Sequence, residues 1–173
     1  MPGPRLLAIV GKKNSGKTTL VVALVHELIR RGHRVMTIKH AAHPFDFDQQ
    51  GRDTWRHMHE GGAERVVMET PRDRVLLAQA KTPMGPRELA DAYLGDAHFV
   101  IVEGFKNSDL PKIEVFRHAV HPEPLYVAGT PEAASYLAVV TDVRDFKAPI
   151  PVLRFTDTNW LYRLTDLVVQ GAR

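Results

Sequence analysis

The sequence predicts an α/β protein with a largely parallel central sheet and an added antiparallel hairpin. Near the start, the aliphatic run "RLLAIV" is followed by a glycine-containing loop and then by a long run with helical periodicity. Further strand-like and helix-like runs alternate along the chain, which favours parallel strands joined by helices. Two strand-like runs in the middle are separated only by a proline-containing turn, which is typical of a hairpin.

Composition narrows the class of protein. The 173 residues, with 25% charged and 44% apolar, are typical of one globular domain, which we expect to span residues 1–173. The net charge is only +3 and the basic residues are scattered, so we expect no nucleic-acid partner. Cysteine is absent, which excludes disulfides and thiolate metal sites. No apolar run approaches the ~18 residues of a membrane span, so we expect a cytoplasmic protein without a membrane partner.

The first third of the chain reads as strand, helix and strand. Arg5 to Val10 is an unbroken aliphatic run of the kind found in buried parallel strands. From Lys17, leucines recur every four residues, and Gly32 stands where a helix cap belongs. The run from Arg34 to His40 predicts the second strand, so the three elements should form a right-handed parallel unit.

The middle of the chain predicts a loop, a short helix and the hairpin. Residues 41–52 carry turn formers and acids without a clear period, and a short helix is expected from Asp53. Strands are expected over 63–70 and 73–81, around a turn at Pro71.

The second half alternates in the same way. A helix is expected over 86–94, where a proline occupies the first helical position. An amphipathic helix is expected over 157–170. Aliphatic runs predict strands over 98–105, 112–116, 125–129, 136–142 and 151–155.

The loop after the first strand matches the pattern G-x-x-x-x-G-K-[ST]. In "GKKNSGKT", Gly11 and Gly16 let successive backbone N–H groups surround one anion, at the positive end of the following helix. Lys17 would then bridge the terminal phosphates of a nucleotide, and the Thr18 hydroxyl would hold Mg²⁺. A surface turn with solubilising lysines is the alternative. The strand-loop-helix context favours the phosphate site, and with it the three-layer fold of P-loop NTPases.

A P-loop also needs carboxylates for its metal, at the carboxyl ends of strands. Glu103 ends the most apolar strand-like run and is the leading candidate, although a glutamate after a strand is often only a polar loop entry. Asp46, Asp48 and Asp53 compete for a second metal-linked role, and their spacing does not choose among them.

Histidines and tryptophans offer weaker signals. His40 and His43 are three residues apart at a strand-to-loop junction, but without cysteines we expect hydrogen bonds or ligand contacts there rather than a dedicated transition-metal site. Trp55 and Trp160 can stack on a base, yet both fall in expected amphipathic helices, where packing is the commoner role.

These residues together resemble the molybdopterin-guanine dinucleotide biosynthesis adaptor protein B family. The resemblance rests on "GKKNSGKTTL", "TIKHAAHPFDFDQQGRDTWR", "GGAERVV" and "VEGFKNSDLPKIEVFR", and runs from residue 6 to about residue 117. It implies a homodimeric GTP-binding protein with weak GTPase activity, in the P-loop class that includes dethiobiotin synthetase and the nitrogenase iron protein. It also implies partnership with the guanylyltransferase that joins GMP to molybdopterin, and with enzymes that receive the finished molybdenum cofactor.

The resemblance also assigns roles to residues. Thr18 and Glu103 would face Mg²⁺; by similarity to dethiobiotin synthetase, Asp53 becomes the second metal-facing acid and Lys39 approaches the terminal phosphate. The phosphate cradle would consist of Lys13, Asn14, Ser15, Gly16, Lys17, Thr18 and Thr19, and Gly11 and Lys12 are further nucleotide-binding candidates.

Two positions depart from the expected patterns. Many family members have an aromatic residue where this chain has Lys12, which resembles either the lysine that reaches a dimer partner's nucleotide in deviant P-loops or a surface substitution. The stretch "VVTDVRD" lacks the N-K-x-D or T-K-x-D guanine signature. Asp142 is therefore our candidate for accepting hydrogen bonds from guanine N1 and N2.

Three functions follow from these features. The first is a GTP-binding adaptor whose unaided turnover is about 10⁻⁴ to 10⁻² per second, because no catalytic arginine stands near the motifs; Gln49 and Gln50 could position a water. The second is a P-loop kinase of a small metabolite, for which Arg72 and Arg74 would have to form a lid. The third is a metallochaperone GTPase that uses the histidines. We expect a homodimer formed through the hairpin edge between Met68 and Leu77.

Overall fold

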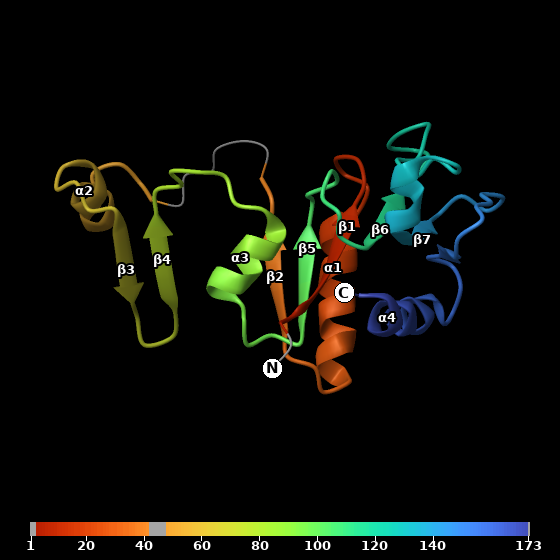
Figure 1. The fold of residues 1–173 in the computed structure, drawn as a ribbon, viewed down its shortest axis with the longest axis horizontal. Coiled ribbons are helices and arrows are strands. Elements are labelled where there is room, and N and C mark those ends of the chain that lie inside the picture. The colour runs from red at the N-terminus through yellow and green to blue at the C-terminus, as the bar shows by residue number, and fades with distance from the viewer. Residues whose placement is uncertain (1–2, 42–47, 173) are drawn as a thin grey trace. The chain divides into compact units, whose positions relative to one another are not determined.

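The computed structural model describes residues 3–41 and 48–172. They belong to two compact units (Figure 1). The larger unit comprises the residues up to His40 and those from Gly85 onward, and the smaller one extends from Ala41 to Met84.

The larger unit is an α/β structure around a six-stranded sheet of order β2-β5-β1-β6-β7-β8. Every neighbouring pair in this sheet is parallel, which confirms the predicted fold class. Its helical elements are α1 (Lys17–Arg30), α3 (Pro86–Tyr93), the 3-10 turn η1 (Pro131–Ser135) and α4 (Trp160–Gly171). Its strands are β1 (Arg5–Val10), β2 (Val35–Lys39), β5 (Phe99–Glu103), β6 (Lys112–Phe116), β7 (Tyr136–Thr141) and β8 (Val152–Arg154).

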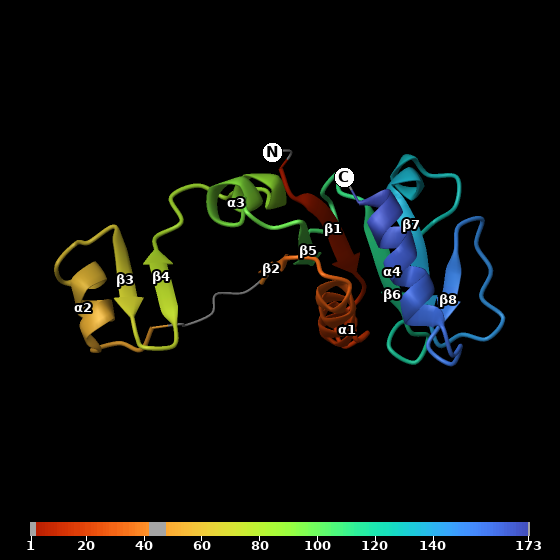
Figure 2. The ribbon, with the colours of Figure 1, turned by 90° about the horizontal axis from the view of Figure 1, so that it is seen from below.

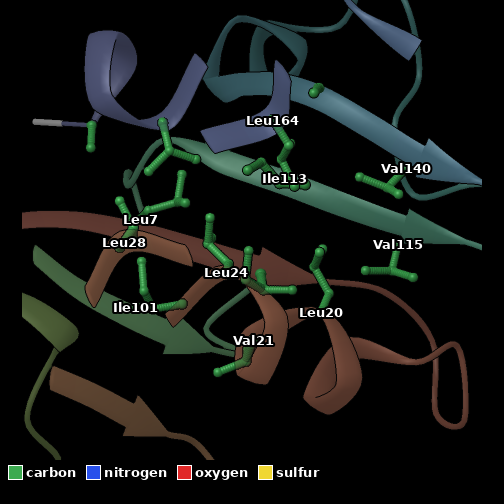
Figure 3. Packing of buried hydrophobic residues seen from close by; sticks show 14 of the residues in the cluster. Leu7, Leu20, Val21, Leu24, Leu28, Ile101, Ile113, Val115, Val140 and Leu164 are labelled. Carbon is green, nitrogen blue, oxygen red and sulfur yellow. The ribbon is translucent and has the colours of Figure 1, made fainter. Parts of the chain in front are cut away.

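The aliphatic strands fill two cores because successive side chains point to opposite faces of a sheet. On one face, Leu7 and Ile9 of β1 pack with leucines of α1 and with Leu164 of α4 (Figure 3). On the other face, Ala8 and Val10 belong to a second cluster that includes Ala90 of α3. The sheet therefore forms a middle layer, with α1 and α4 on one face and α3 on the other (Figure 2).

The register between β1 and β6 determines where the glycine-containing loop lies. Ala8 pairs with Lys112 and Val10 pairs with Glu114, so β6 continues for two residues, Val115 and Phe116, beyond the partner of the last β1 residue. The loop that leaves β1 consequently runs along the end of β6. On the other side of β1, β5 lies between β1 and β2. The order of the strands along the chain does not predict this position of β5.

Arg31 connects α1 to α4 and also pairs with a buried carboxylate of its own helix. Glu27 is 4% exposed and accepts hydrogen bonds from Arg30 and Arg31 of its own helix. Arg31 also pairs with Asp166 of α4 at 2.6 Å. The arginines at the end of α1 therefore take part in the contact between these two helices.

The smaller unit contains α2 (Asp53–His59) and the hairpin of β3 (Arg65–Glu69) and β4 (Arg74–Ala78), whose strands are antiparallel. The predicted helix start at Asp53 and the predicted hairpin are confirmed.

The predicted strand over residues 125–129 is wrong. The backbone N–H groups of Leu125 and Tyr126 donate to the carboxylate of Glu114, at 2.6 and 2.8 Å, instead of to a neighbouring strand. A buried side chain therefore binds the N–H groups that a neighbouring strand would otherwise bind, and the segment is a loop.

The last helix begins at Trp160, three residues later than Asp157, and Trp160 packs against Phe155 as expected for a core residue.

Among the described residues, no helix is both long and apolar enough to span a membrane.

Candidate functional site

The loop between β1 and α1 has a backbone conformation that requires glycine at both glycine positions of the G-x-x-x-x-G-K-[ST] pattern. Gly11 has a φ of +151°, and a Cβ atom there would lie 2.5 Å from the carbonyl oxygen of Val115 and 2.6 Å from Ser15 Oγ. Gly16, the residue before α1, has a φ of +99°. Asn14 also has a positive φ, of 63°. The loop therefore folds back on itself between the end of β6 and the start of α1.

The start of α1 is free to bind an anion. No side chain of the residues that the structure describes caps it, and its first turn contains no acid. The first N–H groups of a helix have no partner within the helix, and its dipole makes this end positive. Ser15 is 2% exposed, and its Oγ has no hydrogen-bond partner among the described residues. A buried hydroxyl without a partner is costly, so a ligand oxygen would complete this cradle.

Lys17 lies over the loop. Its Nζ donates to the carbonyl oxygen of Lys12 at 2.7 Å, which holds the ammonium above the turn. Burial lowers the pKa of Lys17; the negative charge of Glu103 opposes this shift, and the positive charge of Lys39 adds to it. A phosphate group beside these two lysines would relieve their repulsion.

Three elements bring Thr18, Glu103 and Lys39 together. The Thr18 hydroxyl lies 3.0 Å from each carboxylate oxygen of Glu103, which ends β5. Lys39, the last residue of β2, places its Nζ 3.6 Å from the same carboxylate. The parallel register explains the meeting, because Glu103 pairs with both Ile9 and Lys39 at one edge of the sheet. A hydroxyl beside a carboxylate is a suitable ligand pair for Mg²⁺.

These groups line a hollow of about 480 Å³. Three lysines and one carboxylate contribute to its wall, which makes it attractive to a polyanion. The lining residues are Lys13, Asn14, Gly16, Lys17, Thr18, Lys39 and Glu103.

The remaining sequence candidates lie elsewhere. Asp142 follows β7 and pairs with Arg117 at 3.0 Å. Thr19 is exposed in the first turn of α1. Asp53 begins α2 in the smaller unit, so its role in the metal site stays a prediction. Asp48 accepts a hydrogen bond from Thr54 near the start of α2, which gives it a local structural contact.

Two other candidates, Asp46 and His43, fall outside the described residues. Within the described ranges, no group of three or more histidines and acids gathers as a metal site would require.

Sequence reasoning missed Glu114 and Arg117. Glu114 is 1% exposed in β6, and burial raises its pKa, while the N–H groups of Leu125 and Tyr126 and the charge of Lys12 hold it down. Its carboxylate therefore fastens the loop over residues 117–130 to β6. The available signal was the single acid inside the apolar strand "KIEVF". Arg117 carried no signal, because its partner Asp142 is 25 residues away in the sequence.

Comparison with known proteins finds relatives that span most of the chain. A model of the family described as molybdopterin guanine dinucleotide synthesis protein B matches residues 6–142. The molybdopterin-guanine dinucleotide biosynthesis adapter protein of Haemophilus influenzae is 36% identical over 168 residues, which cover 94% of this chain and 86% of the relative. The protein of the same description in Escherichia coli is 30% identical over 174 residues, with 95% and 91% coverage.

Solved structures share the fold. MobB of Bacillus subtilis superposes with a TM-score of 0.68 at 18% identity and covers 98% of both chains. A MobB homologue from Bacillus stearothermophilus gives a TM-score of 0.65 at 23% identity, with 95% and 98% coverage. The structural likeness concerns the fold, and the family match spans most of the sequence. This chain therefore belongs to the family of molybdopterin guanine dinucleotide synthesis protein B, MobB.

Proposed function

We propose that this chain is a GTP-binding adaptor in the synthesis of molybdopterin guanine dinucleotide. The observation that carries the proposal is the hollow at the start of α1, where Lys17, Thr18 and Glu103 meet. The names of the relatives support the pathway, since both are described as adapter proteins of this biosynthesis. The partner would be the guanylyltransferase that joins GMP to molybdopterin, together with enzymes that receive the finished cofactor, in the cytoplasm.

The residues of the hollow divide the work of holding GTP and Mg²⁺. The N–H groups from Lys13 to Thr18 would surround the β-phosphate, as in other glycine-rich loops. Lys17 and Lys39 would neutralise the γ-phosphate. Thr18 and Glu103 would hold the metal, which supplies a positive charge shared between the phosphates, and Asp53 is the proposed second acid.

Guanine recognition is proposed for Asp142. This carboxylate stands at the carboxyl end of β7, and the phosphate loop leaves the carboxyl end of the parallel strand β1. Arg117 holds it through the 3.0 Å ion pair, which orients the carboxylate to accept hydrogen bonds. Its partial exposure leaves room for the N1 and N2 hydrogens of a guanine.

Hydrolysis is expected to be slow. An adaptor of this kind needs the nucleotide for binding, and GTPases without a partner that assists hydrolysis turn over at about 10⁻⁴ to 10⁻² per second. A measured unaided rate above about one per second would argue for a dedicated enzyme instead.

Titration calorimetry with GTP, ATP and GDP, each with and without Mg²⁺, tests the proposal. We expect GTP with Mg²⁺ to bind most tightly, GTP without Mg²⁺ more weakly, and ATP more weakly than GTP because its base offers no paired N1 and N2 donors. Equal binding of GTP and ATP would refute guanine recognition. Phosphorylation of a small acceptor from ATP would instead identify a kinase.

A further inference from the structure

A second pocket, of about 890 Å³, shares no lining residue with the hollow at the phosphate loop. It lies at the amino ends of β6 and β7, next to η1, the C-terminal end of α4 and the start of α3. One wall is the loop over residues 106–111, part of the stretch "VEGFKNSDLPK". The nucleotide proposal uses only Glu103 from this stretch and leaves the rest of it without a role.

The floor of the pocket contains a buried cation. Lys112 is 4% exposed, and its Nζ donates to the carbonyl oxygens of Ser108 and Leu110, at 2.6 and 3.1 Å, and to Ser135 Oγ at 3.0 Å. Among the described residues, no carboxylate lies within ion-pair distance of it. Burial lowers the pKa of Lys112, and the charge of Asp109 opposes this shift only in part. These three protein oxygens take up all three N–H donors of the ammonium, so an anion in the pocket would stabilise the buried charge through its own opposite charge and not through a direct hydrogen bond.

Other groups in the pocket suit the same anion. Ser108 Oγ is buried and has no hydrogen-bond partner among the described residues. Arg87 and Lys106 are exposed at the rim. Arg87 makes a 3.6 Å contact to Asp109, whose side chain is 79% exposed. A hydroxyl, an ammonium and a guanidinium that converge on one space are the groups that bind phosphate in proteins.

The opposite side of the pocket favours hydrogen-bond donors. Gln170 and Gly171 bring the C-terminal end of α4, which carries partial negative charge; the carbonyl oxygens of Val168 and Val169 already accept from Ala172 and Arg5, which leaves those of Gln170 and Gly171 for a ligand. Glu132 adds a carboxylate on the η1 side. A ligand that satisfies both sides carries a phosphate at one end and N–H groups at the other. The volume is within the range of small-molecule sites, about 300 to 1,000 Å³.

We propose that this pocket is a second ligand site, which binds the phosphate ester of a pterin. The phosphate part follows from Lys112, Ser108, Arg87 and Lys106, and the donor-bearing ring follows from the end of α4 and Glu132. The choice of a pterin among such rings rests on the proposed function. With GTP at the phosphate loop and a pterin phosphate here, one chain would carry both substrates of a guanylyl transfer.

The test is a fluorescence titration of the full chain with neopterin monophosphate. We expect saturable binding by the unmodified chain and a roughly tenfold to hundredfold weaker affinity in the double variant Arg87→Ala/Lys106→Ala, which removes two charged contacts. The matched control is Arg163→Ala, an exposed arginine of α4 outside the pocket, which should bind like the unmodified chain. The variant Lys17→Ala should also keep its affinity, because Lys17 belongs to the other hollow.

Each contrary result has a distinct meaning. GMP binding as tightly as neopterin monophosphate would overturn the pterin assignment. Binding that is lost in Lys17→Ala and kept in the double variant would place the ligand at the phosphate loop and overturn the second site. Absence of binding would also overturn it, while the calorimetry with GTP decides the proposed function separately. Folding of each variant is checked by its thermal unfolding.

Discussion

At the scale of single residues, two side chains decide what the hollow beside α1 can hold. Lys17 supplies an ammonium that lies over the loop, and Glu103 supplies the carboxylate that meets Thr18. The first is proposed to contact phosphate and the second to hold metal. Substitutions at the two positions should therefore differ in their dependence on Mg²⁺.

Lys17→Ala should weaken GTP binding by roughly tenfold to more than a hundredfold, with or without Mg²⁺. The reason is the loss of a charge-assisted contact worth ~1.5 to 3 kcal/mol. Calorimetry measures the affinity, and Lys81→Ala, an exposed lysine of the smaller unit, is the control. Unchanged GTP affinity in Lys17→Ala would show that the phosphate assignment is wrong.

Glu103→Gln should abolish most of the gain in GTP affinity that Mg²⁺ gives, because an amide is a poorer ligand for a hard cation than a carboxylate. Binding without Mg²⁺ should be equal or stronger, since a negative charge beside the phosphates is removed. The measurement is a titration with GTP at several Mg²⁺ concentrations. An undiminished Mg²⁺ effect would exclude Glu103 as a metal ligand.

At the scale of elements, the sequence predicted those strands, helices and loops that depend on neighbouring residues alone. The change from the aliphatic run of β1 to the helical period of α1 marks both elements, and the glycines between them require the loop. The position of β5 between β1 and β2 was not predictable, because strand order depends on long-range packing. The loop over residues 125–129 resembles a strand in sequence, and only the distant Glu114 carboxylate makes it irregular.

The ion pairs of Glu27 with the arginines at the end of α1 make the free energy of unfolding depend on pH. Hydrogen bonds from Arg30 and then Arg31 lower the pKa of Glu27 to about 2 from the ordinary value of 4.5. A carboxyl whose pKa is depressed in the folded state contributes stability above its unfolded pKa and loses it as the pH falls through the folded value. Glu27 should therefore stabilise the fold fully above about pH 4.5 and lose this contribution progressively towards about pH 2.

Glu27→Gln tests this expectation. Thermal unfolding should show a lower midpoint for the variant at neutral pH, and the difference from the unmodified chain should shrink as the pH is lowered from about 4.5 to about 2. Glu60→Gln, an exposed partner of Arg56, is the matched control and should leave the profile unchanged. A constant difference across this range would contradict the role of Glu27 charge.

At the scale of the whole molecule, the hairpin of the smaller unit is the proposed dimer contact. Its two strands have open edges, and Val67 and Leu76, which face each other in the register, are 59% and 43% exposed. Exposed apolar side chains on an unpaired hairpin favour association with another chain. The site is proposed to gain from this association if Lys12 reaches the nucleotide of the partner.

Val67→Lys should weaken the dimer, because a charge replaces an apolar contact at the proposed interface. Sedimentation over a range of protein concentrations measures the association, with Val22→Lys, on an exposed position of α1, as control. The unmodified chain should sediment as a dimer and Val67→Lys should shift towards the monomer. A monomer at all concentrations for the unmodified chain would refute the dimer.

The central claim is that the polyphosphate of GTP lies in the loop between β1 and α1. A crystal structure with a non-hydrolysable GTP analogue and Mg²⁺ tests it directly. We expect phosphate oxygens within hydrogen-bond distance of the N–H groups from Lys13 to Thr18, with the metal between Thr18 and the phosphates. A polyphosphate bound elsewhere, or this loop left without one while the nucleotide binds, would contradict the account.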